Sequence, residues 1–345
     1  MQSMSTMDAT LERIWLEFKS LLERNEKDSY PFFFFDYYKG LVDRRIFDKQ
    51  VSNIKYLFQL SKRPIKGSKI LDVGCGFGID CVIMAALGAS EVHGMDYNES
   101  WIKTFNAYLK ELKWELLITP KVGDASQLPY PDDYFDVLLS VEAISHYRDS
   151  GSFIKEANRV LKKNGVLIIS DANNGSNPFI RRKNNKIWER FEHGPPADSF
   201  HGHSIKKSFF DMRKDIIADQ FPQLDGNERN TLAANTFGMG RDEIVRSCEM
   251  YLQRGVFPSS KYQKGIPSFN PVMNDCIERL FAPKMLSKRI KENGFQVRLF
   301  SHFGGAGKKN IISFLNSFLR FFTPVTIYAA RVFKIVAVKK PIYSE

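Results

Sequence analysis

Three glycines at alternate positions carry the clearest chemical signal in this chain. Gly74, Gly76 and Gly78 follow a short apolar run that ends at Val73. Glycine lacks a Cβ and reaches positive φ, so a ligand can approach the backbone closely, and the helix expected next would point free N–H groups at that ligand. A plain glycine turn has the same spacing. The pattern indicates a ligand site only in combination with other residues.

Acidic residues stand before and after this turn. Asp72 precedes the first glycine by two positions, Asp96 follows 18 residues after Gly78, and Asp124 ends a third apolar run. A carboxylate at a strand end can accept hydrogen bonds from both hydroxyls of a ribose, and one before the turn suits a cationic amino group. A dinucleotide site shares the second-strand acid, but it uses GxGxxG spacing, and Asp72 would repel a pyrophosphate. For Asp124 the alternative role is a helix cap.

Apolar runs and helical segments alternate around these residues. We expect strands at 70–73, 91–96, 117–122, 135–140, 166–170, 295–301 and 333–338, and helices at 80–87, 100–112, 152–161 and 284–293. A turn is expected at 163–165. The alternation predicts an α/β fold with a doubly wound, mostly parallel, seven-stranded sheet. Right-handed crossovers would bring the carboxyl ends of the parallel strands to one ligand-binding edge.

The sequence divides into four parts: a helical cap at 1–66, the core at 67–172, an inserted substrate-facing subdomain at 173–283, and the rest of the core at 284–345. The cap is expected to be helical from about 8 to 62. Its aromatic run at 32–38 packs on the core, which we favour, or lines a pocket. In the insertion, His201 and His203 resemble metal ligands, but no further ligands stand at a recognisable spacing, so we expect no metal.

The charge of the chain is uneven. The formal net charge is +11, which suits an anionic partner without separating nucleic acid, anionic lipid and phosphorylated substrate. From residue 303 onward there are seven basic residues and one acid, so this tail carries +6 of that charge. A helix at about 308–323, ended by Pro324, would be basic, aromatic and amphipathic. Such a helix suits peripheral contact with a membrane. The alternative is packing against the insertion or a second subunit.

Compartment signals are few. The four cysteines form no CxxC pair and no disulfide framework, which fits a reducing compartment. Acidic residues interrupt the first apolar segment, unlike a secretory signal, and no run reaches about 18 apolar residues. We expect a cytoplasmic protein that is peripheral to the inner face of the membrane. The sequence leaves the oligomeric state open.

Together these motifs resemble the class I S-adenosylmethionine-dependent methyltransferases. The resemblance is carried by DVGCGFG at 72–78, Asp96, GDA at 123–125 and FDV at 135–137. Two further segments, SVEAISHY at 140–147 and EANRVLKKNG at 156–165, resemble the members that act on small molecules and lipids. The resemblance covers about 68–172 and the closing strands, but neither the cap nor the insertion.

This resemblance implies S-adenosylmethionine as the cofactor. It implies cofactor contacts for Asp72, Gly74, Gly76, Gly78, Asp96, Tyr97, Asp124, Ala125 and Ser140. Leu128 would lie beside the adenine ring. Methyl transfer depends largely on positioning and on excluding water, but a hydroxyl acceptor also needs a base. His146, just past the fourth strand, is the first candidate, and Glu142 is the second. A structural role for His146 is the alternative.

We therefore expect methyl transfer to a small, lipid-linked or glycan acceptor, with oxygen as the favoured atom. Methylation of nucleic acid is a second hypothesis, because the chain is basic. Base-amino methyltransferases of this fold usually carry an Asn/Asp-Pro-Pro-aromatic motif after the fourth strand, whereas this chain reads SVEA at 140–143, which disfavours nucleic acid. A third hypothesis is a membrane-associated protein that binds the cofactor without turnover. The acceptor itself is not specified by the sequence.

Overall fold

The computed structural model describes residues 6–24, 30–114, 117–194, 199–200, 203–204, 206–273, 275–276, 278–304, 316 and 318–340. The chain forms two compact units: Met1–Ser176 with Phe281–Glu345, here unit 1, and Asn177–Leu280, here unit 2. Unit 2 starts four residues after the predicted start of the insertion and ends three residues before its predicted end. The two connections lie side by side in unit 1, where Asn174 and Phe281 form a parallel bridge.

A helical cap covers one side of unit 1. It consists of α1 (Thr6–Arg24), α2 (Phe32–Tyr38), η1 (Lys39–Val42) and α3 (Arg44–Ser61). Asp43 begins α3 as its N-cap, because its carboxylate accepts a hydrogen bond from the Arg45 N–H at 2.8 Å. Phe34 and Phe35 of the aromatic run are buried in the core. Packing, the favoured interpretation of that run, therefore holds for these two residues.

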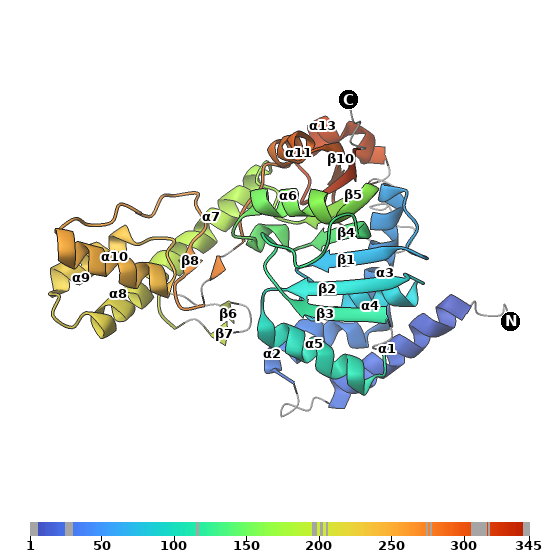
Figure 1. The fold of residues 1–345 in the computed structure, drawn as a ribbon, viewed down its shortest axis with the longest axis horizontal. Helices are drawn as coiled ribbons and strands as arrows, with labels where there is room; N and C mark the ends of the chain where they lie inside the picture. The colour runs from blue at the N-terminus through green and yellow to red at the C-terminus, as the bar shows by residue number, and fades with distance from the viewer. Residues whose placement is uncertain are drawn as a thin grey trace. The chain divides into compact units, whose positions relative to one another are not determined.

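Unit 1 is built on a seven-stranded sheet (Figure 1). Its strands are β1 (Lys69–Val73), β2 (Glu91–Asp96), β3 (Ile118–Val122), β4 (Phe135–Val141), β5 (Leu161–Asp171), β10 (Phe295–His302) and β11 (Val332–Lys339). They lie in the order β10-β11-β5-β4-β1-β2-β3. The strands β1 to β5 pair in parallel, and β11 is antiparallel to both of its neighbours. This confirms the predicted mostly parallel α/β fold.

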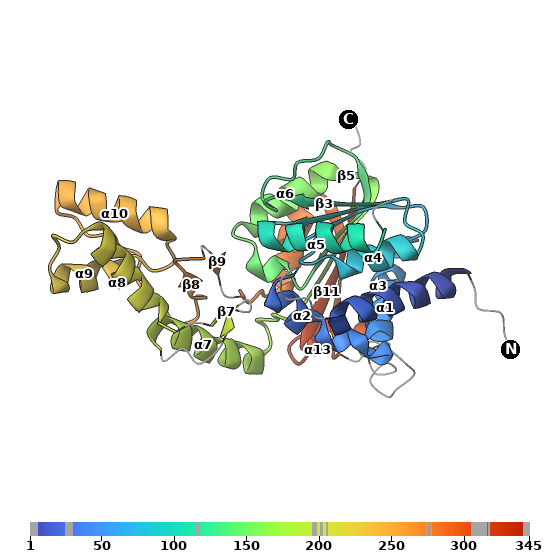
Figure 2. The same ribbon diagram turned by 90° about the horizontal axis from the view of Figure 1, so that it is seen from below.

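Helices cover both faces of this sheet, as Figure 2 shows for α6 and α3 on opposite sides. The remaining helices of unit 1 include α4 (Ile79–Ala86), α5 (Glu99–Glu111), α6 (Ser150–Val160) and α11 (Pro283–Glu292). One apolar core joins the cap, α4 and α5 to strand residues such as Ile70. The other joins α6 and α11 to the alternate residues, such as Leu71. Because successive side chains of a strand point to opposite faces of the sheet, each strand contributes residues to both cores.

One local expectation in the sheet is wrong. The turn expected at 163–165 lies within β5 instead. Leu161 pairs with Phe135, but Val166 pairs with Val137, so β5 advances five residues while β4 advances two. Asn164 accommodates the extra residues with a φ of 62°, a region that asparagine tolerates.

A second local expectation, that Pro324 ends a helix, is also wrong. Pro324 lies in the first turn of α13 (Thr323–Thr326), directly after η4 (Arg320–Phe322). Proline is compatible with this position, because first-turn N–H groups have no helical acceptor. Of the amphipathic helix predicted at about 308–323, all but residues 316 and 318–323 lie outside the described residues.

Unit 2 is mainly helical. It contains α7 (Pro178–His193), α8 (Phe209–Gln220), α9 (Gly226–Asn235), α10 (Arg241–Arg254) and two short pairings, β6 (Ser199–Phe200) with β7 (His203–Ser204) and β8 (Phe269–Asn270) with β9 (Asp275–Cys276). Helices α8, α9 and α10 share an apolar core. Arg213 of α8 and Glu192 of α7 form an ion pair whose side chains are both 1% exposed. Throughout the described ranges, no helix is long and apolar enough to cross a membrane.

Candidate functional site

The glycine turn connects β1 to α4, and its three glycines serve different purposes. Gly74, Gly76 and Gly78 have φ values of 76°, 57° and 80°. A Cβ on Gly74 would lie 2.4 Å from the Cβ of Ala143, and one on Gly78 would lie 2.1 Å from the ring of Phe105. A Cβ on Gly76 would meet nothing closer than 4.0 Å. Internal packing thus requires two of the glycines, and Gly76 is the one with open space beside it.

Asp96 joins the end of β2 to this turn. Its Oδ2 accepts a hydrogen bond from the Gly76 N–H at 2.9 Å, and its Oδ1 accepts one from the Asn98 N–H at 2.9 Å. A carboxylate oxygen can accept more than one hydrogen bond, so both oxygens can also accept hydroxyl donors. This pair of acceptors is compatible with the two hydroxyls of a ribose, and the ribose contact of Asp96 stays a prediction.

Two further carboxyl groups, of Asp72 and Asp80, lie near the turn. Asp72 is buried and accepts a hydrogen bond from the Cys81 thiol at 3.6 Å, while Asp80 accepts one from the Gln50 amide at 2.6 Å. Burial, followed by the charges of Asp80 and Asp96, raises the pKa of Asp72 well above its usual range. Burial also raises the pKa of Asp80 to about 6.

No described cation forms an ion pair with Asp72 or Asp80. A buried carboxylate without a compensating cation is costly, and a cationic ligand removes that cost. The turn is therefore electrostatically suited to a positively charged ligand. Asp72 was assigned to such a ligand from the sequence, whereas Asp80 was missed, although it follows the glycine motif by two positions.

An aromatic side chain from the cap lies beside the glycine turn. Tyr37 of α2 is 63% exposed, unlike Phe34 and Phe35 in the same run. The Tyr37 ring lies 6.0 Å from the ring of Phe77 in the glycine turn, so the cap places this side chain beside the turn. The pocket-lining role of the aromatic run stays a prediction.

The segment after β4 packs directly on the glycine turn. It contains η3 (Ile144–His146), and Ala143 before it is the residue that contacts Gly74. The N–H of Ser145 donates a hydrogen bond to Asp171 Oδ2 at 3.3 Å, and the N–H of His146 donates one to Ala143 O at 2.9 Å. These bonds hold η3 against the ends of β1 and β5. His146, the predicted base, lies half-buried at this edge, and its catalytic role stays a prediction.

Glu142, the second candidate base, has a backbone conformation with φ of 50°. Its N–H donates a hydrogen bond to Ser170 O at 2.7 Å, and its carboxylate accepts one from the Ala172 N–H at 3.0 Å. The side chain therefore fastens the loop after β4 to the end of β5. These hydrogen bonds explain why an acidic residue stands at this position without requiring it to act as a base.

Tyr147 links Ser140 of β4 to the end of β1 through two hydrogen bonds. Tyr147 donates its hydroxyl proton to Val73 O at 2.7 Å, so the Ser140 hydroxyl, 2.9 Å away, is the donor to Tyr147. Ser140 is fully buried. The cofactor contact predicted for Ser140 stays a prediction. Tyr147 has no role in the sequence interpretation, although it belongs to the SVEAISHY segment.

The residues predicted around the adenine lie next to Asp96. The Gly123 N–H donates a hydrogen bond to Asp96 O at 3.0 Å, and Ala125 is buried. The exposed Asp124 accepts a hydrogen bond from the Ser126 N–H at 2.7 Å, which closes a local turn; no helix begins there, so the alternative role as a helix cap is wrong. Tyr97, directly after Asp96, is exposed. The adenine contacts of these residues stay predictions.

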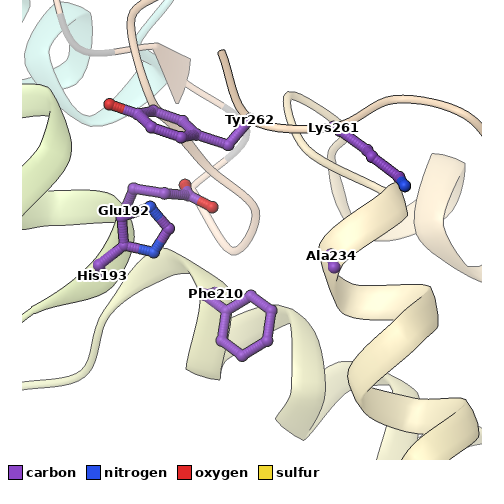
Figure 3. Close-up of a pocket in the computed structure, with 6 residues that line it drawn as sticks. All are labelled: Glu192, His193, Phe210, Ala234, Lys261 and Tyr262. Carbon is purple, nitrogen blue, oxygen red and sulfur yellow. The ribbon is translucent and has the colours of Figure 1, made fainter. Parts of the chain in front are cut away.

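Two cavities are lined entirely by described residues of unit 2. Figure 3 shows the first, about 350 Å³ in volume, in which the rings of His193 and Tyr262 lie beside the Glu192 carboxylate. The second, about 450 Å³, is basic: its lining includes Arg181, Arg182, Lys186 and Lys264 with one acid, Glu189. Among the described residues, no cluster of His, Cys, Asp and Glu is arranged to hold a metal. The side chains of His201 and His203 lie outside the described residues.

Comparisons with known proteins identify the domain around the glycine turn. A family model described as a methyltransferase domain matches residues 71–169. The ubiquinone biosynthesis O-methyltransferase of Pelagibacter ubique is 37% identical over 120 residues, which cover 35% of this chain and 48% of that protein. The ajmaline N-methyltransferase of Rauvolfia serpentina is 30% identical over 125 residues, covering 36% and 42%. The chain thus matches less than half of either relative.

A solved structure described as an S-adenosylmethionine-dependent methyltransferase of Mesorhizobium loti aligns over 84% of this chain and 98% of its own, with 14% identity and a TM-score of 0.42. The family match and the sheet order define the class of the domain. Residues 71–169, with the strands that complete their sheet, form a class I S-adenosylmethionine-dependent methyltransferase domain.

Proposed function

We propose that this protein transfers a methyl group from S-adenosylmethionine to a small, lipid-linked or glycan acceptor, with oxygen as the favoured acceptor atom. One relative methylates oxygen and another nitrogen by their names, so the atom is not set by the relatives. The preference for oxygen comes from His146, because a hydroxyl acceptor requires a base and an amine does not always.

The carrying observation is a pair of carboxyl groups beside the turn at Gly76, those of the buried Asp72 and the half-buried Asp80, which form no ion pair with any described cation. S-adenosylmethionine, when bound, supplies a methyl group on a cationic sulfonium together with a cationic amino group. Gly76 gives its ribose end room to approach, and Asp96 provides two oxygens for the ribose hydroxyls. Asp72 and Asp80 favour the positive charge.

The acceptor side of the proposal depends on the segment after β4. Asp171 fixes η3 through Ser145, and η3 holds His146 at the edge where the parallel strands end. The Nδ1 of His146 is buried, so Nε2 is the nitrogen proposed to take the proton from an acceptor hydroxyl.

The first prediction tests cofactor binding at Asp96. In Asp96→Ala, both hydrogen-bond acceptors for the ribose are lost, and we expect affinity for S-adenosylmethionine to fall by at least about 30-fold, or roughly 2 kcal/mol. Isothermal titration of wild type and variant measures this. The matched control is Asp215→Ala, which removes an exposed acid from α8 and should bind like wild type.

Two results of this titration would contradict the proposal: no binding by the wild-type protein, or equal binding by Asp96→Ala and wild type. The acceptor is identified separately. Mass spectrometry of lipid and glycan extracts from cells with and without the gene should reveal a species that differs by one methyl group, and its fragmentation locates the methylated atom. If the protein binds S-adenosylmethionine but the extracts show no such methylated species, the result would favour a protein that binds the cofactor without turnover.

A further inference from the structure

The segment that contains η4 and α13 (Figure 1) has a group of exposed apolar side chains. We call it the tail patch. Its members are Phe318, Phe321, Phe322, Val325 and Tyr328, each at least half exposed, with Phe321 at 72% and Val325 at 74%. Their spacings of three and four residues place them on one face of the helical segment. The rings of Phe318 and Phe322 lie 5.3 Å apart, so the patch is continuous there.

The opposite face of this segment points inward, and it combines polar side chains with Ile327, which is fully buried in the apolar core of unit 1. Thr323 is buried, and its hydroxyl accepts a hydrogen bond from the Ser301 N–H of β10 at 3.1 Å. The Thr326 hydroxyl lies 2.6 Å from that of Ser301. The carbonyls of Ile327 and Ala330 accept hydrogen bonds from the Asn174 amide. An amphipathic segment of a globular protein normally turns its apolar face inward. Here these hydrogen bonds and the buried Ile327 hold the inward face, and the side chains of the tail patch stay exposed.

Cations surround the patch. The Arg320 guanidinium lies 5.1 Å from the ring centre of Phe321, and the Lys284 ammonium lies 4.8 Å from that of Tyr328. Arg331 follows and is exposed. The sequence contains no Asp or Glu between residues 303 and 344. The charges around the patch are therefore complementary to an anionic partner.

We propose that the tail patch binds the surface of an anionic lipid bilayer, with its phenyl rings and Val325 inserted at the level of the headgroups and its cations against lipid phosphates. Exposed aromatic and aliphatic groups bordered by Lys and Arg match the two attractions that hold proteins at such surfaces. This proposal does not depend on methyl transfer. It places the membrane contact on side chains fixed by β10 and Asn174, rather than on an independent helix.

A lipid surface is favoured over a second copy of the chain by charge. Two copies that meet through this patch would bring Arg320, Lys284 and Arg331 of both against each other with no acid of the patch to neutralise them. Like charges brought together in this way oppose association. A bilayer that contains anionic lipid has no such conflict.

Sedimentation with vesicles tests the proposal on the full-length protein. Wild type should bind vesicles of phosphatidylcholine with phosphatidylglycerol, bind weakly to phosphatidylcholine alone, and lose binding as salt increases. The variant Phe321→Ser/Val325→Ser should bind the anionic vesicles at least about tenfold more weakly. Arg331→Glu should weaken binding to anionic vesicles while leaving the small binding to neutral vesicles unchanged.

The matched control is Leu16→Ser/Met250→Ser, which removes two exposed apolar side chains from α1 and α10. It should sediment like wild type. Circular dichroism should show that all variants stay folded, because the substituted side chains are exposed. Equal sedimentation of wild type and Phe321→Ser/Val325→Ser would overturn the proposal. So would a wild-type dimer in analytical ultracentrifugation that this variant dissociates, without vesicle binding by either protein.

Discussion

Asp80 couples the stability of unit 1 to pH through a single carboxyl group. Its pKa in the folded protein is about 6, above the ordinary value of 3.8, because the group is buried. The folded state therefore binds this proton more tightly than the unfolded state does. The stabilisation is complete below about pH 4 and is lost as pH rises through about 6.

The corresponding prediction concerns Asp80→Asn, which can still accept the hydrogen bond from Gln50. Between pH 4 and 7, the free energy of unfolding of wild type relative to this variant should fall by about 1 to 3 kcal/mol. Urea unfolding at several pH values measures the difference, and other titrating groups cancel in it. S-adenosylmethionine, as a cation, should bind wild type more tightly as pH rises through about 6.

Asp215→Asn serves as the control for this experiment, because Asp215 is an exposed residue of α8 paired with Lys207. It should retain the wild-type dependence on pH. Identical pH dependence in wild type and Asp80→Asn would show that Asp80 is not the responsible group.

At the scale of elements, the junction of β1 and α4 depends on how closely the segment after β4 approaches it. A comparison of Gly74 with Gly67 isolates the energetic cost of this contact, because the φ values of the two glycines are nearly equal, 76° and 77°. A Cβ on Gly67 would meet nothing within 4 Å, whereas one on Gly74 would lie 2.4 Å from Ala143. The two alanine variants therefore share the backbone strain but not the clash.

We predict that Gly67→Ala lowers the free energy of unfolding by about 1 kcal/mol and that Gly74→Ala lowers it by a further 1 to 3 kcal/mol, roughly. Urea unfolding compares the two variants. Gly74→Ala should also bind S-adenosylmethionine more weakly, since relief of the clash moves η3 or the turn. Equal destabilisation by both substitutions would mean that the turn and Ala143 separate at no cost.

At the scale of the whole molecule, the two units have separate cores, and unit 2 depends on a buried ion pair. Arg213 donates hydrogen bonds to Glu192 and, from Nε, to Ala233 O at 2.9 Å. Removal of the arginine leaves a buried carboxylate uncompensated. The loss of stability should therefore be confined to unit 2, which contains the ion pair.

For Arg213→Ala we predict destabilisation of unit 2 by about 3 to 5 kcal/mol. Circular dichroism during urea unfolding should show an earlier transition for unit 2, while S-adenosylmethionine still stabilises the transition of unit 1. The matched control is Arg241→Ala, whose ion pair with Asp219 is exposed and should contribute less than about 1 kcal/mol. A cost no larger for Arg213→Ala than for Arg241→Ala would contradict the prediction.

The sequence by itself determined the features that depend on neighbouring residues. The periods of apolar residues located β1, β2, β4 and the closing strands to within a few positions, because burial of one strand face imposes that period locally. The glycine spacing located the turn, since positive φ favours glycine. Asp96 was identified from two features that can be read along the chain, its position at the end of a predicted strand and its distance from the glycine turn.

Only the tertiary structure decided which distant residues meet. The insertion of β11 between β5 and β10 and the approach of the Tyr37 ring to Phe77 of the glycine turn each join positions that local pattern does not link. The tail patch is the clearest case. Its period predicts an amphipathic helical segment, but the period cannot say which face is buried. The buried face is decided by the hydrogen bonds of Ser301 and Asn174 and by the burial of Ile327, all of which require the packed sheet.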